Sequence, residues 1–351
     1  MPLTSTAPDG IDRQAVERWL AVHAPTLRPP FEYVLIAGGR SNLTFRGQDA
    51  GGRRFVLRRP PLGNTLESAH DMGREHRVLS ALAPTPVPVP AVLALCDDPS
   101  VNGAPFYVME HLDGPILRDA SDVVERYDEA QRAVLTDSLV DTLAAIHLVD
   151  PDAVGLGTLG RREDYLGRQL RRWQRQYDEV KAREIAQVDE AHRRLVARQP
   201  AQQRDTLVHG DYRIDNVAFS SDAAAPPRVA GVLDWELCTL GDPLADLGGM
   251  FVHWMQTGES NDHMLWDPPS RLPGFPTREQ LADRYAARTG FDLSGIAYYE
   301  AFAYWRMACI SEGVYARFRD GAMGEQEDAE TVDRLGALVV MLADRSLELL
   351  P

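Results

Sequence analysis

The sequence lacks any run of 18 or more apolar residues, and its first twenty residues contain neither a basic start nor an apolar core. The first absence excludes a membrane-spanning helix, and the second argues against a secretory signal peptide. We therefore expect a cytoplasmic protein that has no membrane as a partner.

Cysteine is scarce, because the 351 residues include only three, and these lie far apart without CxxC spacing. This spacing argues against a zinc cluster or a disulfide framework. Buried thiols are the expected state of Cys96, Cys238 and Cys309. The nine histidines show no paired metal-ligand spacing either, which disfavours a metal-dependent hydrolase.

Positive charge is in deficit, since 37 Lys and Arg residues stand against 52 Asp and Glu residues and the formal net charge is -15. Such a chain as a whole repels phosphate backbones and anionic membranes. Nucleic acid is therefore not an expected partner. An anionic nucleotide would need a divalent cation and local positive groups in order to bind.

The pattern along the chain changes once, near residues 110–115. Short β-rich runs separated by glycines over residues 33–58 predict an antiparallel meander. After residue 115 the pattern is helical, and residues 163–199 predict one long charged helical stretch. Because the chain also exceeds the size of one typical core, we predict an α+β bilobal fold. Its expected parts are a small antiparallel-sheet lobe, 1–112, and a mostly helical lobe, 113–351.

The segment HGDYRIDNV, residues 209–217, carries Asp211 and, five positions later, Asn216. Asp234 ends the next short apolar run, VAGVLD. Oxygen-bearing side chains at the ends of two neighbouring strands predict a site for a hard cation, and Mg²⁺ prefers one or two such ligands with substrate phosphates. Asp211 is then available for a reacting hydroxyl. A single aspartate in a turn more often caps the backbone, so the combination is what indicates chemistry.

With these motifs the chain resembles the aminoglycoside phosphotransferase and choline kinase family, which has a protein-kinase-like fold. The resemblance is carried by His209-Gly210-Asp211 with Asn216, by Leu233-Asp234-Trp235-Glu236, and by Gly241-Asp242-Pro243 followed by Asp246-Leu247. It extends over the order of lobes from about Tyr33 onwards. The runs FVLRRPP, PFYVMEHLDG and HGDYRIDN also look like the kinase-like domain that some larger proteins carry fused to an acyl-CoA dehydrogenase.

The resemblance implies that Asp211 orients the acceptor hydroxyl and accepts its proton, and that Asn216 and Asp234 bind Mg²⁺. Arg213 stands where protein kinases carry a lysine that touches the γ-phosphate, with a solvated surface side chain as the alternative. Asp246 resembles the buried acidic residue that braces the loop of Asp211.

In the small lobe the resemblance implies an ATP site. Ser41 and Asn42, which follow two glycines, would donate hydrogen bonds to phosphate oxygens, although an ordinary hairpin turn explains the same residues. Glu110 and Leu112 would offer backbone groups to the adenine edge.

Arg58 departs from the family pattern, because it stands where protein kinases have a lysine at the end of the third strand. Arginine keeps the positive charge and can bind phosphate through two nitrogens, but it is bulkier. A pair between Arg58 and Glu75 of the following helix is the hypothesis that this position suggests. The substitution is also the one feature that points towards a pseudokinase.

The charged stretch places Arg168, Arg172 and Arg175 at positions i, i+4 and i+7, on one helical face beside Trp173. This face is either solvated or receives an anionic acceptor, such as the phosphates of a coenzyme A thioester. A polycationic aminoglycoside would instead need an acidic pocket, for which GEQEDAE, residues 324–330, is a candidate.

The sequence therefore predicts an ATP- and Mg²⁺-dependent phosphotransferase that moves the γ-phosphate to a hydroxyl of a small molecule, with a hydroxyacyl-CoA-type metabolite preferred. An aminoglycoside O-phosphotransferase that confers antibiotic resistance is one alternative, and a catalytically inactive, nucleotide-binding pseudokinase is another. The presence of Asp211, Asn216 and Asp234 together favours catalysis. The choice between ATP and GTP and the oligomeric state stay open.

Overall fold

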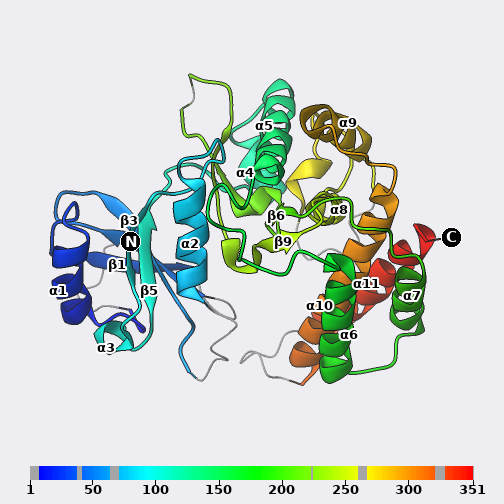
Figure 1. The fold of residues 1–351 in the computed structure, drawn as a ribbon, viewed down its shortest axis with the longest axis horizontal. Helices are drawn as coiled ribbons and strands as arrows, with labels where there is room; N and C mark the ends of the chain where they lie inside the picture. Colours follow the sequence, from blue (N-terminus) through cyan, green and yellow to red (C-terminus); the bar gives the residue numbers. More distant parts are fainter. Residues whose placement is uncertain are drawn as a thin grey trace. The chain divides into compact units, whose positions relative to one another are not determined.

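The computed structural model describes residues 8–37, 42–63, 71–222, 224–259, 267–320 and 329–350. The chain divides into two compact units, and each is described by itself (Figure 1). The first unit contains residues 1–114 and 230–238, and the second contains residues 115–229 and 239–351.

Residues 230–238 belong to the first unit although their place in the sequence suggested the helical lobe. Backbone contacts explain this, since Val232 N donates to Pro88 O at 2.8 Å. A side chain adds to them, because Arg74 Nη2 donates to Cys238 O at 2.7 Å. The segment carries Asp234, which is thus positioned by the N-terminal unit.

The described residues of the first unit form a five-stranded antiparallel sheet with the strand order β1-β2-β3-β5-β4. The strands are β1 (Glu32–Ala37), β2 (Leu43–Gln48), β3 (Arg54–Arg59), β4 (Val92–Cys96) and β5 (Phe106–Glu110). The meander predicted for residues 33–58 is confirmed as β1, β2 and β3. The other elements of this unit are α1 (Arg13–His23), α2 (Met72–Leu82), α3 (Pro99–Asn102), most of β8 (Val229–Val232) and a 3₁₀ turn, η2 (Trp235–Leu237).

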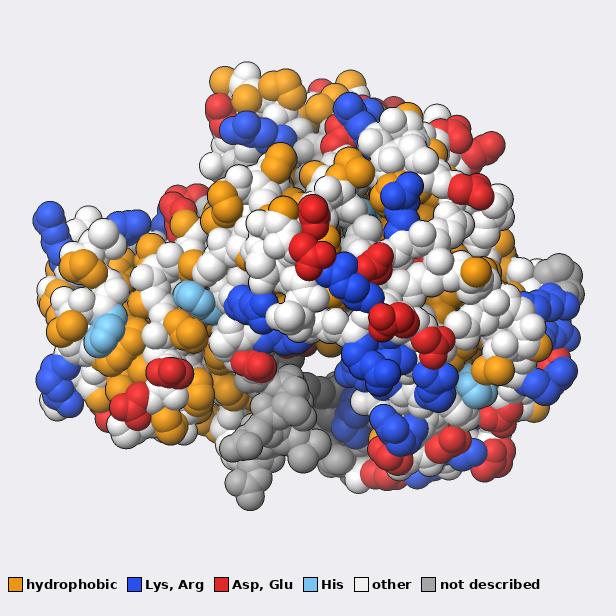
Figure 2. Space-filling model, in the orientation of Figure 1, with side chains coloured by type: hydrophobic (Ala, Val, Ile, Leu, Met, Phe, Trp, Pro, Cys, Tyr) orange, Lys and Arg blue, Asp and Glu red, His pale blue; other side chains and the backbone are white. Residues whose placement is uncertain are grey.

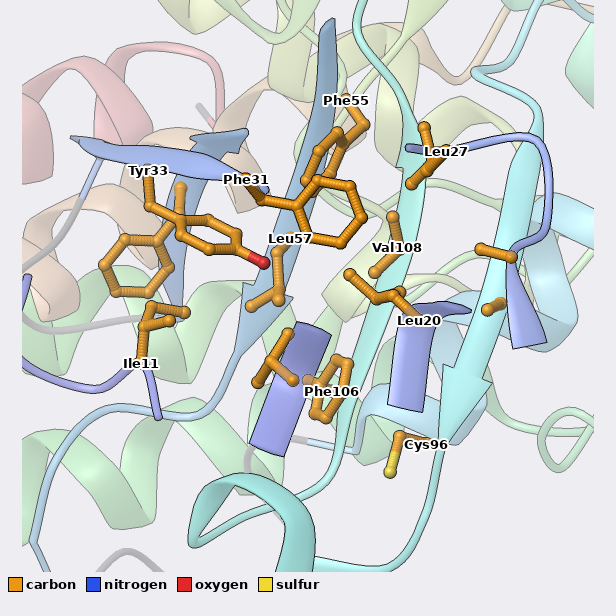
Figure 3. Close-up of a cluster of buried hydrophobic side chains, with 14 of the residues drawn as sticks. Ile11, Leu20, Leu27, Phe31, Tyr33, Phe55, Leu57, Cys96, Phe106 and Val108 are labelled. Carbon is orange, nitrogen blue, oxygen red and sulfur yellow. The ribbon is translucent and has the colours of Figure 1, made fainter. Parts of the chain in front are cut away.

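One face of this sheet carries an apolar cluster that α1 covers (Figure 3). Phe55 lies at its centre, with ring centroids 5.4 Å from Phe31 and 5.9 Å from Tyr33, both edge to face. Val16 and Leu20 of α1 are fully buried in the same cluster. Alternate residues of a strand point to opposite faces. The neighbours of the cluster residues along β3 and β5 therefore point to the other face, and that face carries polar side chains.

The second unit is mostly helical. Its elements are α4 (Ala120–Val124), α5 (Glu129–Leu148), α6 (Tyr165–Val180), α7 (Ala186–Ala197), β6 (Thr206–Val208), η1 (Ile214–Asn216), β7 (Val217–Phe219), β9 (Thr239–Gly241), α8 (Leu244–His253), η3 (Pro269–Arg271), α9 (Arg278–Thr289), α10 (Ile296–Arg319) and α11 (Ala329–Glu348). β6 and β9 pair antiparallel, and α10 packs along α6, α8 and α11 (Figure 1). Over the described residues, no helix combines the length and the apolar character that crossing a membrane requires.

The helical stretch predicted for residues 163–199 is present and consists of two helices, α6 and α7. The break between them is held by Glu312 of α10, which is fully buried. Its carboxylate accepts a hydrogen bond from Ala182 N at 3.1 Å and lies 3.3 Å from Arg183 Nε. A contact of this kind, with a residue 130 positions away, leaves no periodic signal in the sequence.

The aromatic cluster yields a stability prediction. Phe55→Ala should lower the free energy of unfolding by about 3–5 kcal/mol, because the ring is fully buried and its removal leaves a cavity. Urea unfolding followed by circular dichroism measures this. Leu35→Ala, at a side chain that is 47% exposed, is the control and should change the value by less than about 0.5 kcal/mol. Equal losses in the two variants would show that the cluster does not stabilise the unit.

Candidate active site

The loop from His209 to Asn216, here called the HGD loop, follows β6 in the second unit. One carboxylate holds its backbone in place through hydrogen bonds. Asp246 of α8 accepts hydrogen bonds from His209 N at 2.6 Å and from Gly210 N at 2.8 Å. Gly210 has φ of +88°, a conformation that glycine adopts without strain. The brace expected of Asp246 is therefore present.

A histidine and a tyrosine continue the hydrogen-bonded chain from Asp246 into the core. His147 of α5 places Nε2 3.2 Å from Asp246 Oδ2 and Nδ1 2.6 Å from the hydroxyl of Tyr285. Burial opposes ionisation of Asp246, yet the hydrogen bond and charge interaction with His147 hold its pKa below the usual range. Asp246 is thus an ionised carboxylate at neutral pH, and it can accept from both backbone N–H groups at once.

Asp211 itself is surrounded by groups that stabilise its ionised form. Asn216 Nδ2 donates to both the backbone oxygen and Oδ2 of Asp211, each at 2.8 Å. Arg213 Nε lies 3.3 Å from the same Oδ2. Although burial raises it, the pKa of Asp211 lies below its usual range, chiefly because of the Arg213 guanidinium. Asp211 can therefore act as a proton acceptor.

Arg213 lies between two acidic groups, because its Nη1 is also 2.9 Å from Asp215 Oδ2. Its side chain is 29% exposed, so it is neither a freely solvated arginine nor a buried one. The γ-phosphate contact expected of it stays a prediction.

A small hollow of about 10 Å³, enough for one water-sized group, lies beside Asp211. Asp211, His253 and Arg306 are among the residues that line it. Burial and the Arg213 guanidinium lower the pKa of His253 to about 4, so its imidazole is neutral at physiological pH. The sequence motifs do not point to His253. Its one signal is its position seven residues after Asp246, which places both on the same face of α8.

In the first unit, the polar face of the sheet carries Arg58 among three carboxylates. Arg58 Nε is 3.3 Å from Glu75 Oε2, Nη2 is 2.5 Å from Asp234 Oδ1, and Nη2 is 3.5 Å from Glu236 Oε2. The predicted pair between Arg58 and Glu75 is confirmed by this geometry. Tyr107, which pairs with Arg58 across β3 and β5, donates its hydroxyl to Glu75 at 2.7 Å.

Asn42 is buried in the same group and donates through Nδ2 to Glu75 at 2.9 Å and to Glu236 at 3.1 Å. Its amide nitrogen is therefore directed to carboxylates, and the phosphate contact expected of Asn42 stays a prediction. Ser41 and the two glycines before it lie outside the described residues.

Glu110 and Leu112, at and after the end of β5, are the residues predicted to face the adenine base through their backbone groups. Glu110 N donates to Ala91 O at 2.8 Å, so the group that Glu110 can present is its carbonyl oxygen. The side chain of Leu112 packs directly over Gly231, where any Cβ would collide with it. This contact holds the link against β8 and explains why a glycine occupies position 231.

The residues expected to bind Mg²⁺ lie in different units, Asn216 in the second and Asp234 in the first. Their chemistry fits a hard cation. Asn216 donates through its nitrogen, which leaves the amide oxygen for a metal. Asp234 adopts a left-handed conformation with φ of +63°, and one of its carboxylate oxygens lies within 4.8 Å of oxygens of Glu75 and Glu236. Such a concentration of negative charge can be balanced by a divalent cation in addition to the Arg58 guanidinium.

Comparison with known families decides the classification. The model of the family described as the phosphotransferase enzyme family matches residues 32–299. The chain belongs to this phosphotransferase family. The family predicted from the HGD and LDWE motifs is thereby confirmed.

Two curated relatives are larger proteins. Acyl-CoA dehydrogenase family member 10 of Mus musculus is 36% identical over 317 residues, which is 90% of this chain and 29% of the relative. Acyl-CoA dehydrogenase family member 11 of Rattus norvegicus is 34% identical over 355 residues, which is 97% of this chain and 44% of the relative. The phosphotransferase chain thus spans less than half the length of either relative.

Solved structures confirm the kinase-like fold. A protein from Ralstonia eutropha JMP134 that bears the provisional name aminoglycoside phosphotransferase is 32% identical, with a TM-score of 0.79 over 96% of this chain and 98% of its own. A ternary complex of APH(2″)-IIa with streptomycin and ATP is 14% identical, with a TM-score of 0.57 over 88% and 91%. Choline kinase from Cryptosporidium parvum Iowa II is 11% identical, with a TM-score of 0.63 over 95% and 96%. The last two show the fold alone.

The buried brace of the phosphotransferase yields a pH-dependent prediction. Asp246→Asn should lower the free energy of unfolding by about 3 kcal/mol or more, because the amide accepts through one oxygen only. Since the pKa of Asp246 is depressed in the folded protein, its contribution is complete above the unfolded pKa of about 3.9 and is lost as the pH falls through the folded value. The loss relative to wild type should therefore be constant from pH 8 to about pH 5 and shrink below that.

Urea unfolding across this pH range measures the effect. Asp205→Asn, which removes a partly exposed carboxylate paired with Arg162, is the control and should cost less than about 1 kcal/mol. A pH-independent or negligible loss for Asp246→Asn would contradict the assignment of Asp246 as a charged brace.

Proposed function

We propose that this phosphotransferase is an ATP- and Mg²⁺-dependent kinase that transfers the γ-phosphate to a hydroxyl of a small molecule. The observation that carries the proposal is the state of Asp211. Its carboxylate is held ionised by Arg213, is fixed by Asn216, and borders a hollow that fits one hydroxyl-sized group. Phosphoryl transfer depends mainly on positioning and on neutralised charge, and this arrangement supplies the first.

The residues of the HGD loop would then divide the work. Asp211 accepts a hydrogen bond from the acceptor hydroxyl and takes its proton as the oxygen–phosphorus bond forms. Arg213 turns from its carboxylate partners towards the transferred phosphoryl group, where a guanidinium offsets developing negative charge. Asp246 keeps the backbone of His209 and Gly210 in place throughout.

ATP and Mg²⁺ are part of the proposal. We propose Asn216 and Asp234 as the residues that hold Mg²⁺, and Arg58 with Glu75 as the pair that meets the phosphates. A bound Mg²⁺ supplies charge neutralisation for the phosphate oxygens. Ser41 and Asn42 are proposed for the phosphates, and Glu110 and Leu112 for the adenine edge. The known ATP complex of APH(2″)-IIa supports ATP as the donor.

For the acceptor, we propose a hydroxylated metabolite of the hydroxyacyl-CoA type. Two observations support it: the relatives named acyl-CoA dehydrogenase family members and the basic face of α6. An aminoglycoside acceptor is favoured by the names of solved neighbours. The acidic segment 324–330 considered for it lies almost wholly outside the described residues.

An inactive pseudokinase has one observation in its favour. Arg58 contacts Asp234 directly, so the guanidinium occupies the carboxylate proposed for the metal. Against this reading, Asp211, Asn216 and Asp234 are all present, and Arg58 is also within 3.5 Å of two other carboxylates that could retain it.

Arg58→Ala should raise the KM for ATP about tenfold or more, because a charged hydrogen bond to a phosphate is worth about 1.5–3 kcal/mol. Steady-state kinetics with varied ATP measures this. Arg54→Ala on the same strand, whose partly exposed side chain pairs with Asp113, is the matched control and should leave KM unchanged. An unaltered KM in Arg58→Ala would remove Arg58 from the nucleotide site.

Asp211→Asn should lower kcat by about 10²–10⁴-fold with little effect on ATP binding, since it removes the proton acceptor and preserves shape. The measurement is transfer of labelled γ-phosphate with Mg²⁺ to aminoglycosides, choline-like alcohols and hydroxyacyl-CoA thioesters. Asp215→Asn removes a carboxylate of the same loop and should have a much smaller effect. Transfer that survives in Asp211→Asn would refute its role, and ATP binding without transfer to any acceptor would favour the pseudokinase.

A further inference from the structure

Arginines lie along α6 and α10, and one of them, Arg306, lines the hollow beside Asp211. In the described part of the chain, no carboxylate lies within ion-pair distance of Arg168, Arg172 and Arg175 of α6 or of Arg306 of α10, although neighbouring Arg171 pairs with Asp164 at 2.7 Å. Basic side chains gather on the surface over α6 (Figure 2). In a protein with a net charge of -15, unpaired cations in one place need an explanation.

Two of these guanidinium groups contain buried nitrogens without hydrogen-bond partners, Nη1 of Arg168 and Nε of Arg306. A buried N–H that lacks an acceptor costs about 1–3 kcal/mol, so such groups are normally satisfied by protein, water or a ligand. Arg168 Nη2, by contrast, donates to Arg161 O at 2.6 Å. The unsatisfied Nε of Arg306 therefore lacks an acceptor at the hollow beside Asp211.

A chain of contacts leads from Asp211 through Arg306 and Trp173 to Arg172, and Arg172, Arg175 and Arg306 are here called the arginine strip. Arg306 lines the hollow beside Asp211, and its guanidinium carbon lies 5.9 Å from the ring of Trp173 on α6. Arg172 approaches the same ring at 5.4 Å. Arg175 lies one turn beyond Arg172 on the same face of α6. From Arg168 to Arg175 the helix rises about 10 Å.

We propose that Arg172, Arg175 and Arg306 form a subsite for an anionic group, a phosphate or a carboxylate, of the acceptor whose hydroxyl reaches Asp211. The inference rests on the proposed function and adds the residues that select the acceptor. Guanidinium groups bind phosphate and carboxylate oxygens through paired hydrogen bonds, and Trp173 holds two of them in position. A polycationic acceptor would be repelled by the same strip, so the subsite also discriminates against aminoglycosides.

The test is equilibrium binding by isothermal titration calorimetry, with saturating Mg²⁺ and ADP so that the nucleotide site is filled. Coenzyme A is the phosphate-bearing probe, malate the carboxylate-bearing probe, and pantetheine the uncharged counterpart of coenzyme A. Wild type should bind at least one anionic probe about tenfold or more tightly than pantetheine. Binding of coenzyme A alone would identify phosphate as the group, and binding of malate alone would identify a carboxylate.

The variants are Arg306→Gln and the pair Arg172→Gln with Arg175→Gln, and each should weaken binding of the anionic probe about tenfold. Arg171→Gln removes the same charge from the same helix and should change binding less than twofold. If Arg306→Gln lowers the melting temperature, the exposed pair on α6 carries the test. Anionic probes that bind no better than pantetheine, or variants that bind like wild type, would overturn the subsite.

Binding and transfer separate this inference from the proposed function. Asp211→Asn should bind the anionic probe like wild type while losing transfer. Anion binding that depends on the arginines in a protein without transfer would support the subsite and refute the kinase. Transfer to neutral acceptors without anion binding would support the kinase and refute the subsite.

Discussion

The structure of the second unit depends on one buried carboxylate. Asp246 accepts the backbone N–H groups of His209 and Gly210, and it is kept ionised by His147 in a region from which water is excluded. An ionised group in such a place is costly unless all its acceptor positions are used. Burial of the Asp246 charge is tolerated only while both backbone N–H groups donate to it. The HGD loop is therefore rigid, because any other loop conformation would leave the charge without its donors. The position of Asp211 is therefore fixed by the hydrogen bonds of the preceding backbone to Asp246.

The first unit also contains a buried charged side chain, in this case a cation, Arg58. Arg58, predicted to stand where protein kinases have a lysine, lies among Glu75, Asp234 and Glu236. A planar guanidinium can face several carboxylates at once, whereas an ammonium is a point charge on a flexible stem. Burial raises the pKa of Glu75 even though Arg58 and the Tyr107 hydroxyl favour its ionised form. Asp234 and Glu236 by themselves outnumber the single guanidinium of Arg58, so the cluster keeps an excess of negative charge, which favours binding of a divalent cation.

Net charge gives little information about local chemistry in this protein. The overall value of -15 argues against nucleic acid and anionic surfaces, yet α10 brings the guanidinium of Arg306 to the hollow beside Asp211, 5.9 Å from the ring of Trp173 on α6. Close to the hollow, the guanidinium of Arg306 outweighs the average field, because solvent and salt screen the distant carboxylates. His253 does not add to this local charge, since its lowered pKa leaves it neutral.

Short-range information was sufficient for much of this protein. The alternating β-rich runs predicted the meander, and the HGD and LDWE motifs predicted the family, since strand periodicity and loop chemistry are local properties of the chain. The pair of Arg58 with Glu75 followed from the family pattern. Other features came only from the tertiary structure: the break held by Glu312, the assignment of residues 230–238 to the N-terminal unit, His147 behind Asp246, and His253 and Arg306 beside Asp211. Each of these joins segments far apart in the chain, and such contacts are decided by packing and by the need to satisfy buried polar groups, which no local pattern records.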